Sequence, residues 1–300
     1  MIGTGRRVVL GISGHRTSHL VGWAALLARA GDRVRIVHGY RPIPYAATDW
    51  QLPVDDDHLI RKVSERHVLA AAAKLRRARP DITVTSELAG NPAGRVLAEA
   101  ARGADLVMVG AAHCDRSRLV LARLLAEADC PVVVFGAAEP LLVGPVTALL
   151  RGSQADDSIL RASFALAHQR GCGLLVLKPW QPPLDGSASY AETAEQKALD
   201  GYLAGIGELF PDVAVAAELR FGQPPRILVE HSAADLLVLG LPRPNTQPEY
   251  RNLLLDTVLP AHGYPIMLIP ETGLRSRRLA SELRPNQSYR VAADPIGGSR

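Results

Sequence analysis

The sequence predicts an α/β protein with two tandem, doubly wound domains, each built on a Rossmann-like, five-stranded, mostly parallel sheet. Three observations lead to this prediction: an internal repeat, apolar runs that alternate with helical patterns, and several strands that are continuous apolar runs. A repeat of this size indicates that one domain is written twice. Strand–helix alternation implies right-handed crossovers and therefore a parallel sheet.

The repeat is clearest where each copy reaches a glycine. The stretch "GADLVMVG" ends at Gly110, and "AADLLVLG" ends at Gly240. Upstream, "GNPAGRVLAEAARGAD" matches "GQPPRILVEHSAAD" if two residues are deleted from the first. Downstream, "CPVVVFG" matches "YPIMLIP", with Pro131 on Pro265, and near the start of each copy "VVLGISG" matches "VTALLRG". The difference in residue number between matched positions changes along the chain, as expected of two diverged copies whose loops have gained or lost residues.

The elements follow in the same order in both copies. The first copy has strands at 6–12, 33–40, 81–88, 105–110 and 130–136, with helices at 17–31, 57–78, 93–102 and 118–128 between them. The second copy has strands at 146–152, 173–180, 213–220, 235–240 and 265–270, with helices at 157–170, 190–209, 224–232 and 252–261. Continuous β-branched and leucine runs indicate strands covered by helices on both faces. The first helix is amphipathic and is expected to close at Gly31, and Ser18 and Asp157 are expected to cap their helices.

The length of the chain indicates the number of domains, and its charge is concentrated in one segment. Three hundred residues suit two domains of about 150 residues each. We place them at 1–138 and 139–272, joined near 138–145, with a basic tail at 273–300. The tail is rich in Arg, Ser and Gly and is predicted to be disordered. Its six arginines against Glu282 and Asp294 give +4, which equals the net charge of the whole chain. The body is therefore formally neutral, and net charge gives no argument for nucleic acid as a partner.

Several classes of protein are disfavoured. No apolar run approaches the roughly 18 residues that span a bilayer, and the first residues lack the apolar core of a signal peptide. Three unpatterned cysteines suit a reducing cytoplasm. No metal is predicted, because adjacent residues such as His113 and Cys114 point in different directions and no further ligand lies at suitable spacing. No catalytic residues are predicted, since a Walker loop, a dinucleotide fingerprint and a Ser-His-Asp order are all missing from the sequence.

Glycines mark the expected binding crevices. In a doubly wound sheet, ligands bind beyond the carboxyl ends of the strands, at the point where the strand order reverses. Gly11, Gly14, Gly110, Gly152 and Gly240 fall at or beside such ends. Glycine lets backbone N–H groups approach an anion, and the following helix adds its positive N-terminal end. The alternative is that a strand-to-helix turn needs a positive φ whatever it binds.

These stretches resemble a known family. "VVLGISG", then "GWAALLARAG", then "GNPAGRVLAEAARGADLVMVG" and a final "DCPVVVF" look like a universal stress protein domain, and the second copy looks like a degraded version of it. The resemblance covers 1–137 and 144–270. It implies a cytoplasmic stress-response protein, in a family whose members often bind ATP or AMP and usually pair by their edge strands. Tandem two-domain members are a familiar form of that family.

The family's nucleotide motif is degenerate in both copies. Its binding members carry Asp at the end of the first strand and G-x2-G-x9-G-S/T after the fourth. The first copy has Ser13 for the Asp, keeps Gly110, and has His113 for the second glycine and Arg118-Leu119 for Gly-Ser. The second copy has Arg151, keeps Gly240, and has Arg243 and then Asn252-Leu253. ATP binding in the usual family manner is therefore not expected, although Arg118, Arg151 and Arg243 could grip an anion through their planar donor forks.

Three functions stay open. The first is a regulatory protein that senses an adenine nucleotide or another anion through the glycine loops at Gly110 or Gly240. The second is an interaction scaffold for an unknown protein partner, with its pockets filled. The third and weaker one is an ATP-hydrolysing member of a related superfamily. If the copies pair as family dimers do, the strands "PVVVF" and "PIMLI" lie at an internal pseudo-twofold interface, and a further homodimer is open.

Overall fold

The computed structural model describes most of the chain. The described ranges are 5–13, 17–40, 55–110, 115–136, 144–153, 155–181, 188–222, 236–261 and 263–271, together with residues 224 and 227. The predicted disordered tail, most of the expected 224–232 helix and most of the linker near 138–145 lie outside these residues, as do Gly14 and His113.

Strands and helices alternate along the first half and along most of the second, where β9 is the next described element after β8. The first half contains β1 (Arg7–Gly11), α1 (Thr17–Leu27), β2 (Arg33–Gly39), α2 (Asp55–Ala78), β3 (Thr83–Ala89), α3 (Ala93–Ala101), β4 (Leu106–Gly110), α4 (Asp115–Glu127) and β5 (Val132–Phe135). The second contains β6 (Val146–Leu149), α5 (Asp156–Arg170), β7 (Leu174–Trp180), α6 (Ala188–Gly207), β8 (Val215–Phe221), β9 (Leu236–Leu241), α8 (Pro248–Leu253), the π-helical turn η1 (Leu254–Val258), α9 (Leu259–Ala261) and β10 (Ile266–Pro270).

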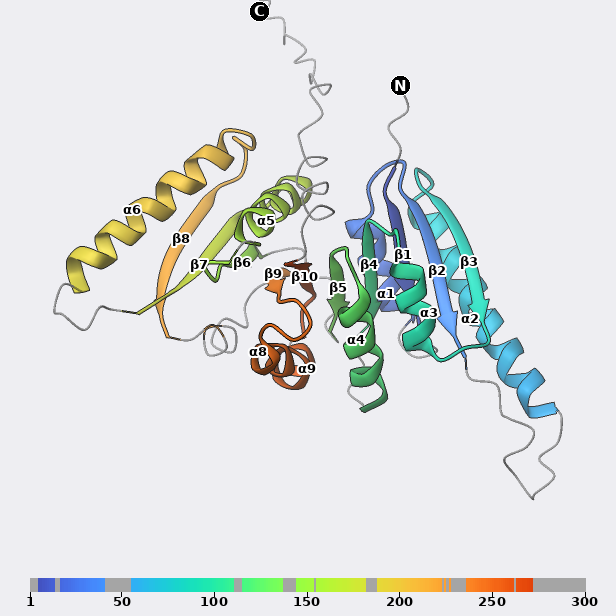
Figure 1. Ribbon diagram of the computed structural model, residues 1–300. Coiled ribbons are helices and arrows are strands. Elements are labelled where there is room, and N and C mark those ends of the chain that lie inside the picture. The colour runs from blue at the N-terminus through green and yellow to red at the C-terminus, as the bar shows by residue number, and fades with distance from the viewer. Residues whose placement is uncertain are drawn as a thin grey trace, which may run out of the picture.

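All ten strands belong to one sheet, in the order β3-β2-β1-β4-β5-β10-β9-β6-β7-β8. Within each half the strands are parallel. Counted outward from the middle of the sheet, the order β5-β4-β1-β2-β3 of the first half corresponds to β10-β9-β6-β7-β8 of the second. The halves meet where β5 and β10 pair antiparallel, with Val133 opposite Met267 (Figure 1). The predicted α/β class and the tandem doubly wound arrangement are confirmed.

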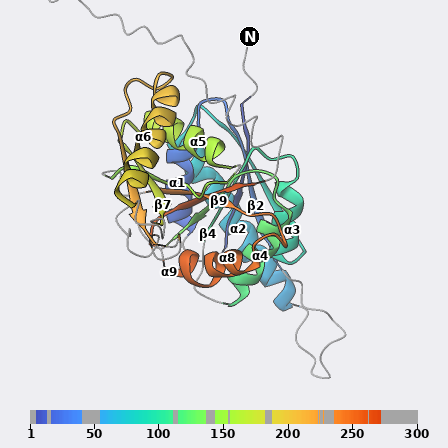
Figure 2. The same cartoon turned by 60° about the vertical axis from the view of Figure 1, so that its left-hand side comes forward.

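Helices cover both faces of the sheet, as the continuously apolar strands at its centre require. One hydrophobic cluster joins the sheet to α1, α2, α5 and α6, and a second joins it to α3, α4 and η1 (Figures 1 and 2). Each cluster contains residues from both halves, so the core continues across the β5–β10 seam. Trp23 of α1 is buried and stacks on Phe135 of β5, with ring centroids 5.8 Å apart. No helix in the described ranges has the length and apolar character needed to cross a bilayer.

A buried carboxylate fixes the turn between α1 and β2. Asp32 is 1% exposed and accepts hydrogen bonds from Nη2 of Arg6 at 2.6 Å, from Nε of Arg6 at 3.2 Å and from the backbone N–H of Arg29 at 2.8 Å. The helix itself ends at Leu27 rather than at Gly31 as expected, and Gly31 adopts a φ of 83° in the turn that follows. The glycine therefore serves the turn into β2 rather than closing the helix directly.

Candidate functional site

Each half has one crevice where the strand order reverses. In the first half it lies between the carboxyl ends of β1 and β4, where Gly11 pairs with Val109. In the second half it lies between β6 and β9, where Leu149 pairs with Leu239. The predicted site residues Gly11, Gly110 and Gly240 stand at these strand ends.

Packing explains why two strands of the first half end in glycine. A Cβ on Gly11 would lie 2.5 Å from Cδ2 of Leu97, and a Cβ on Gly110 would lie 3.1 Å from Cδ2 of Leu20. Both leucines are buried, and neither glycine has a positive φ. The two glycines therefore make room for side chains of α3 and α1.

Gly152, in contrast, is required by its backbone. It has a φ of 70°, in the left-handed region, and a Cβ there would meet no atom within 4 Å. Its N–H donates to Oδ2 of Asp156 at 2.8 Å, and the N–H of Arg151 donates to the same carboxylate at 3.3 Å. The backbone donors expected to receive an anion thus receive the chain's own carboxylate. Asp156, rather than the expected Asp157, satisfies this loop, while Asp157 pairs with Arg161 on α5.

Gly152→Ala is expected to lower the free energy of unfolding by about 1–2 kcal/mol, because alanine resists the left-handed conformation. Chemical denaturation measures the change. The control is Gly201→Ala in α6, where a Cβ also meets nothing within 4 Å but the backbone is helical. That substitution should stabilise the protein by up to about 1 kcal/mol. Equal effects of the two substitutions would contradict the assignment.

The crevice of the second half is filled by polar side chains. A Cβ on Gly240 would lie 3.3 Å from Oε1 of Glu271, so this carboxylate covers the strand end. Nη1 of Arg151 lies 3.6 Å from the same oxygen, and these two side chains are only 11% and 16% exposed. Cζ of Arg151 lies over the ring of Tyr250, 3.7 Å from its centroid, and the guanidinium also donates to Gln247.

The three arginines proposed to grip an anion all contact other parts of the chain. Arg118 of α4 pairs with Asp256 of η1, which links the two halves. Arg151 pairs with Glu271, as described above. Nε of Arg243 donates to the backbone oxygen of Glu271 at 3.3 Å. The guanidinium groups are therefore engaged within the protein, and Glu271 is the common contact of two of them.

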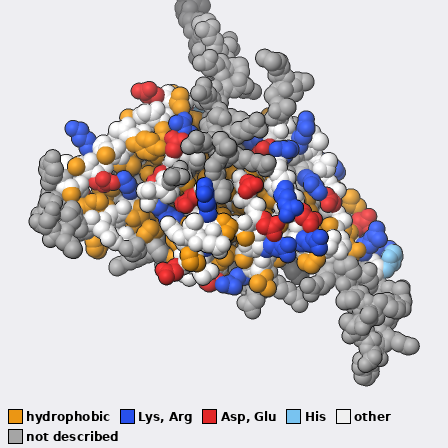
Figure 3. All heavy atoms as spheres, viewed as in Figure 1, with side chains coloured by type: hydrophobic (Ala, Val, Ile, Leu, Met, Phe, Trp, Pro, Cys, Tyr) orange, Lys and Arg blue, Asp and Glu red, His pale blue; other side chains and the backbone are white. Residues whose placement is uncertain are grey.

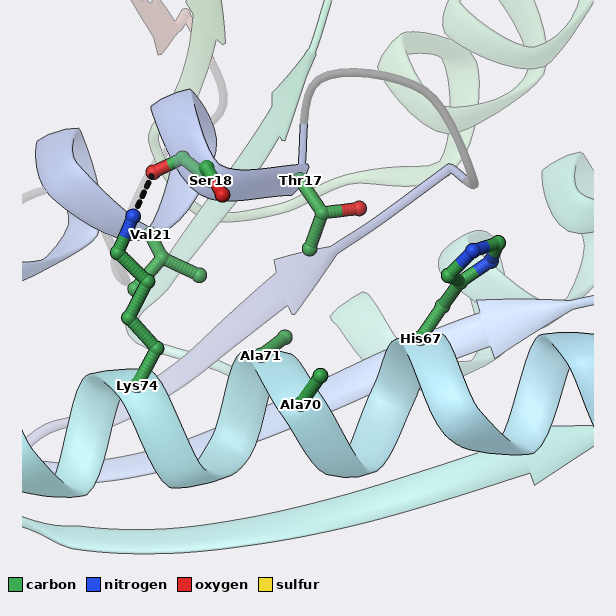
Figure 4. Close-up of a pocket in the computed structure, with 7 residues that line it drawn as sticks. All are labelled: Thr17, Ser18, Val21, His67, Ala70, Ala71 and Lys74. Carbon is green, nitrogen blue, oxygen red and sulfur yellow. Dashed lines mark hydrogen bonds between the residues drawn. The ribbon is translucent and has the colours of Figure 1, made fainter.

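The first half has two open clefts along α2, and one of them lies beside the start of α1. One cleft of about 380 Å³ is lined by Thr17, Ser18 and Val21 of α1 and by His67, Ala70, Ala71 and Lys74 of α2 (Figure 4). Nζ of Lys74 donates to the backbone oxygen of Ser18 at 3.3 Å. The hydroxyl of Thr17 donates to the backbone oxygen of Ser13 at 2.8 Å, so the predicted Ser13 adjoins this cleft.

A second, more apolar cleft of about 330 Å³ shares His67 with the first. His38, Leu59, Ile60, Val63 and Ser64 complete its lining. His38 stands near the end of β2, and its Nδ1 lies 2.8 Å from the backbone oxygen of Ile12, which follows β1. The pair of clefts therefore reaches from the end of the sheet along α2. Sequence reasoning missed His67 and Lys74 because they sit in an ordinary charged helix without a motif.

The described residues were expected to hold neither a metal site nor a nucleic-acid surface, and the following two observations bear on these expectations. Among the described residues, no group of three His, Cys, Asp or Glu side chains is placed to hold a metal ion. On the face drawn in Figure 3, basic and acidic side chains are interspersed rather than separated into a basic stripe. A phosphate backbone prefers concentrated positive charge, which this face does not offer.

Comparison with known proteins identifies the family of the first half. Residues 5–136 match the Universal stress protein family. The universal stress protein Rv2623 of Mycobacterium tuberculosis is 29% identical over 216 residues, which cover 66% of this chain and 70% of that protein. The universal stress protein Rv2005c of the same organism is 28% identical over 267 residues, covering 78% of this chain and 86% of that protein.

Solved structures share the fold along nearly the whole chain. A universal stress protein from Archaeoglobus fulgidus superposes with a TM-score of 0.60 at 15% identity, covering 90% of this chain and 98% of that one. The cytoplasmic domain of a prokaryotic cation chloride cotransporter superposes with a TM-score of 0.59 at 8% identity. The fold alone therefore does not fix the function. The family match and the curated relatives confirm the resemblance found in the sequence: the chain carries a universal stress protein domain at residues 5–136, within a tandem α/β fold.

Proposed function

We propose that this protein is a universal-stress-type regulatory protein in which the first half binds an adenine nucleotide or a similar small anion. The second half acts as its closed structural partner. The observation that carries the proposal is a difference between the two halves. In the second half Glu271 covers Gly240, whereas in the first half two clefts stay open beside α1 and α2.

The polar cleft has the chemistry that a phosphate group needs. Lys74 supplies an ammonium group, His67 supplies a ring nitrogen, and Thr17 and Ser18 supply hydroxyl groups at the first turn of α1. The N-terminal end of this helix adds partial positive charge. A cleft of about 380 Å³ lies within the usual size of small-molecule sites.

The apolar cleft suits the other end of a nucleotide. Leu59, Ile60 and Val63 offer an apolar surface for a planar base, and His38 offers a polar edge beside it. Because His67 lines both clefts, one ligand can lie across it, with its base on the apolar side and its phosphates near Lys74. The usual family motif is degenerate at Ser13, so this mode relies on α2 rather than on the glycine loop.

Lys74→Met is expected to weaken binding of ATP by about tenfold or more, because a charge-assisted hydrogen bond to phosphate is lost. Calorimetric titration with ATP and Mg²⁺, repeated with AMP and with inorganic phosphate, measures the change. Lys62→Met is the matched control, since Lys62 is an exposed lysine of the same helix outside the cleft lining. Arg151→Lys should leave this affinity unchanged, because Arg151 belongs to the other half.

The interaction scaffold is the second candidate, and the filled crevice of the second half favours it. If the wild-type protein gives neither heat nor a thermal shift with millimolar ATP, AMP or phosphate, the nucleotide proposal fails and the scaffold remains. Release of phosphate from bound ATP in the presence of Mg²⁺ would instead favour the hydrolase candidate.

A further inference from the structure

The two outermost strands of the sheet differ in how their outer edges are covered. β3 and β8 lie at opposite ends of the ten-stranded sheet, and the strand order of the described residues places no strand beyond either of them (Figure 1). Such an edge presents backbone N–H and C=O groups that can pair with another strand. Aligning Pro80 with Pro211 matches β3 with β8 residue by residue, so the two edges can be compared directly.

An arginine covers the edge of β3. Nη2 of Arg76, in α2, donates to the backbone oxygen of Val84 at 2.8 Å, so this acceptor of the edge is occupied. The same alignment puts Gly207, the last residue of α6, at the position of Arg76, so the equivalent side chain is missing at β8. The matched residues of the two strands also differ in exposure, because Val84 is 6% exposed and Val215 is 38% exposed. The edge of β8 is therefore the more open of the two.

The outward backbone groups of β8 belong to alternate residues. The oxygen of Ala214 accepts a hydrogen bond from β7, and the N–H of Gly222 donates one to β7, so the even-numbered residues bond inward. Because the direction alternates along a strand, the N–H and C=O groups that point away from β7 belong to Val215, Ala217, Leu219 and Phe221. The side chains of these four residues share one face of the sheet, and Phe221 is 71% exposed on it. This edge therefore combines outward backbone groups with exposed apolar surface.

The charges on the other face of β8 favour one register when the strand pairs with a second molecule of the same chain. Glu218 and Arg220 both lie on that face and form an exposed ion pair within the strand. In an antiparallel pair centred on Leu219, each Glu218 stands opposite Arg220 of the other molecule. A pair centred on Glu218 or on Arg220 would instead place like charges directly opposite each other, which is destabilising. The strand is therefore complementary to itself in the register centred on Leu219.

We propose that β8 is a dimerisation edge, at which two molecules of this protein pair antiparallel in the register centred on Leu219. The N–H and C=O groups of Leu219 then exchange hydrogen bonds with those of the second molecule, and Phe221 stands opposite the small side chain of Ala217. This interface is distinct from the β5–β10 seam, which already joins the two halves within one chain. Because β8 has only seven residues, we expect a weak dimer with a Kd of about 1–10 µM.

The test is sedimentation velocity of the full chain at about 1 to 100 µM, over which the mass should rise from one chain to two. Leu219→Pro removes the central outward N–H while leaving the hydrogen bonds to β7 in place, so it should abolish the dimer. Leu88→Pro is the matched control, since Leu88 holds the equivalent position on β3, and it should leave dimerisation unchanged. A wild-type chain that stays at the mass of one molecule throughout would overturn the proposal. So would equal loss of the dimer in the two proline variants.

A charge exchange tests the register without proline, at two side chains that are 41% and 44% exposed and whose replacement should leave the chain folded. Glu218→Arg places arginines opposite each other, and Arg220→Glu does the same with glutamates, so each change should weaken the dimer by about tenfold or more. The two changes together restore opposite charges at both positions and should recover the wild-type Kd. A double variant that dimerises no better than the single variants would overturn the register, with circular dichroism confirming that every variant is folded. These residues lie outside the clefts of the first half, so the outcome is independent of the nucleotide proposal.

Discussion

Replacing Asp32 with alanine is expected to lower the free energy of unfolding by about 3–5 kcal/mol, because breaking a buried ion pair leaves an uncompensated charge. The Asp32 side chain is 2% exposed and that of Arg6 is 13% exposed. The carboxylate accepts from two nitrogens of the Arg6 side chain and from the backbone N–H groups of Arg6 and Arg29. Alanine would leave all these donors without that acceptor, and only the bond from Arg6 to the oxygen of Leu27 would remain.

Two further variants distinguish the effect of losing this buried ion pair from the effect of losing an exposed one. Glu99→Ala removes an exposed pair with Arg95 on α3, whose side chains are 50% and 58% exposed. It should cost no more than about 0.5 kcal/mol. In a double-mutant cycle, Arg6→Ala together with Asp32→Ala should cost less than the two single changes added, since each single change strands the other charge. Urea denaturation followed by circular dichroism gives all four values, and a loss below about 1 kcal/mol for Asp32→Ala would be inconsistent with its burial.

Patterns in the sequence were sufficient to predict the fold class and the tandem arrangement. The run at 106–110 has no polar side chain. Such a run predicts a strand that is buried on both faces of the sheet. The structure agrees, because β4 is buried along most of its length. Alignment of Pro131 with Pro265 indicates that β5 and β10 are the equivalent last strands of the two copies. Periodicity is a local property of the chain, so it survives in a single sequence.

The role of the glycines was not predictable from the same patterns. Gly110 and Gly240 look identical in the sequence, yet one makes room for Leu20 and the other for the carboxylate of Glu271. Leu20 lies far before Gly110 in the chain, and Glu271 follows Gly240 by a whole helical region and a strand. Such neighbours are set by tertiary packing, which no motif at the glycine itself records. Among the candidate site glycines that the structure describes, Gly152 alone has the positive φ that a turn can need.

The same limit applies to the candidate ligand groups. Arg118, Arg151 and Arg243 replace residues of the family motif, and the structure places all three against other groups of the chain. Lys74 and His67 stand on α2, whose charged face has no distinctive spacing. A functional position on a solvated helix looks like any surface residue until the fold puts α1 opposite it.

The seam between β5 and β10 gives the second large effect. Val133 is fully buried and stands opposite Met267, which is 4% exposed. Val133→Asp would place a carboxylate in the core that both halves share, so we expect it to lower the free energy of unfolding by about 4 kcal/mol or more. Leu69→Asp is the control, because it makes a similar change at a leucine of α2 that is 54% exposed. It should change stability by no more than about 0.5 kcal/mol.

Because the two hydrophobic clusters continue across the seam, the wild-type chain should unfold in one cooperative step. In Val133→Asp the halves lose the contact that couples them, so near-ultraviolet signals from Trp23 in the first half and Trp180 in the second should no longer change together. These tryptophans report on opposite sides of the seam, since Trp23 stacks on Phe135 and Trp180 ends β7. Coincident transitions with undiminished stability in Val133→Asp would mean that the halves are held together by their helices rather than by the β5–β10 pair.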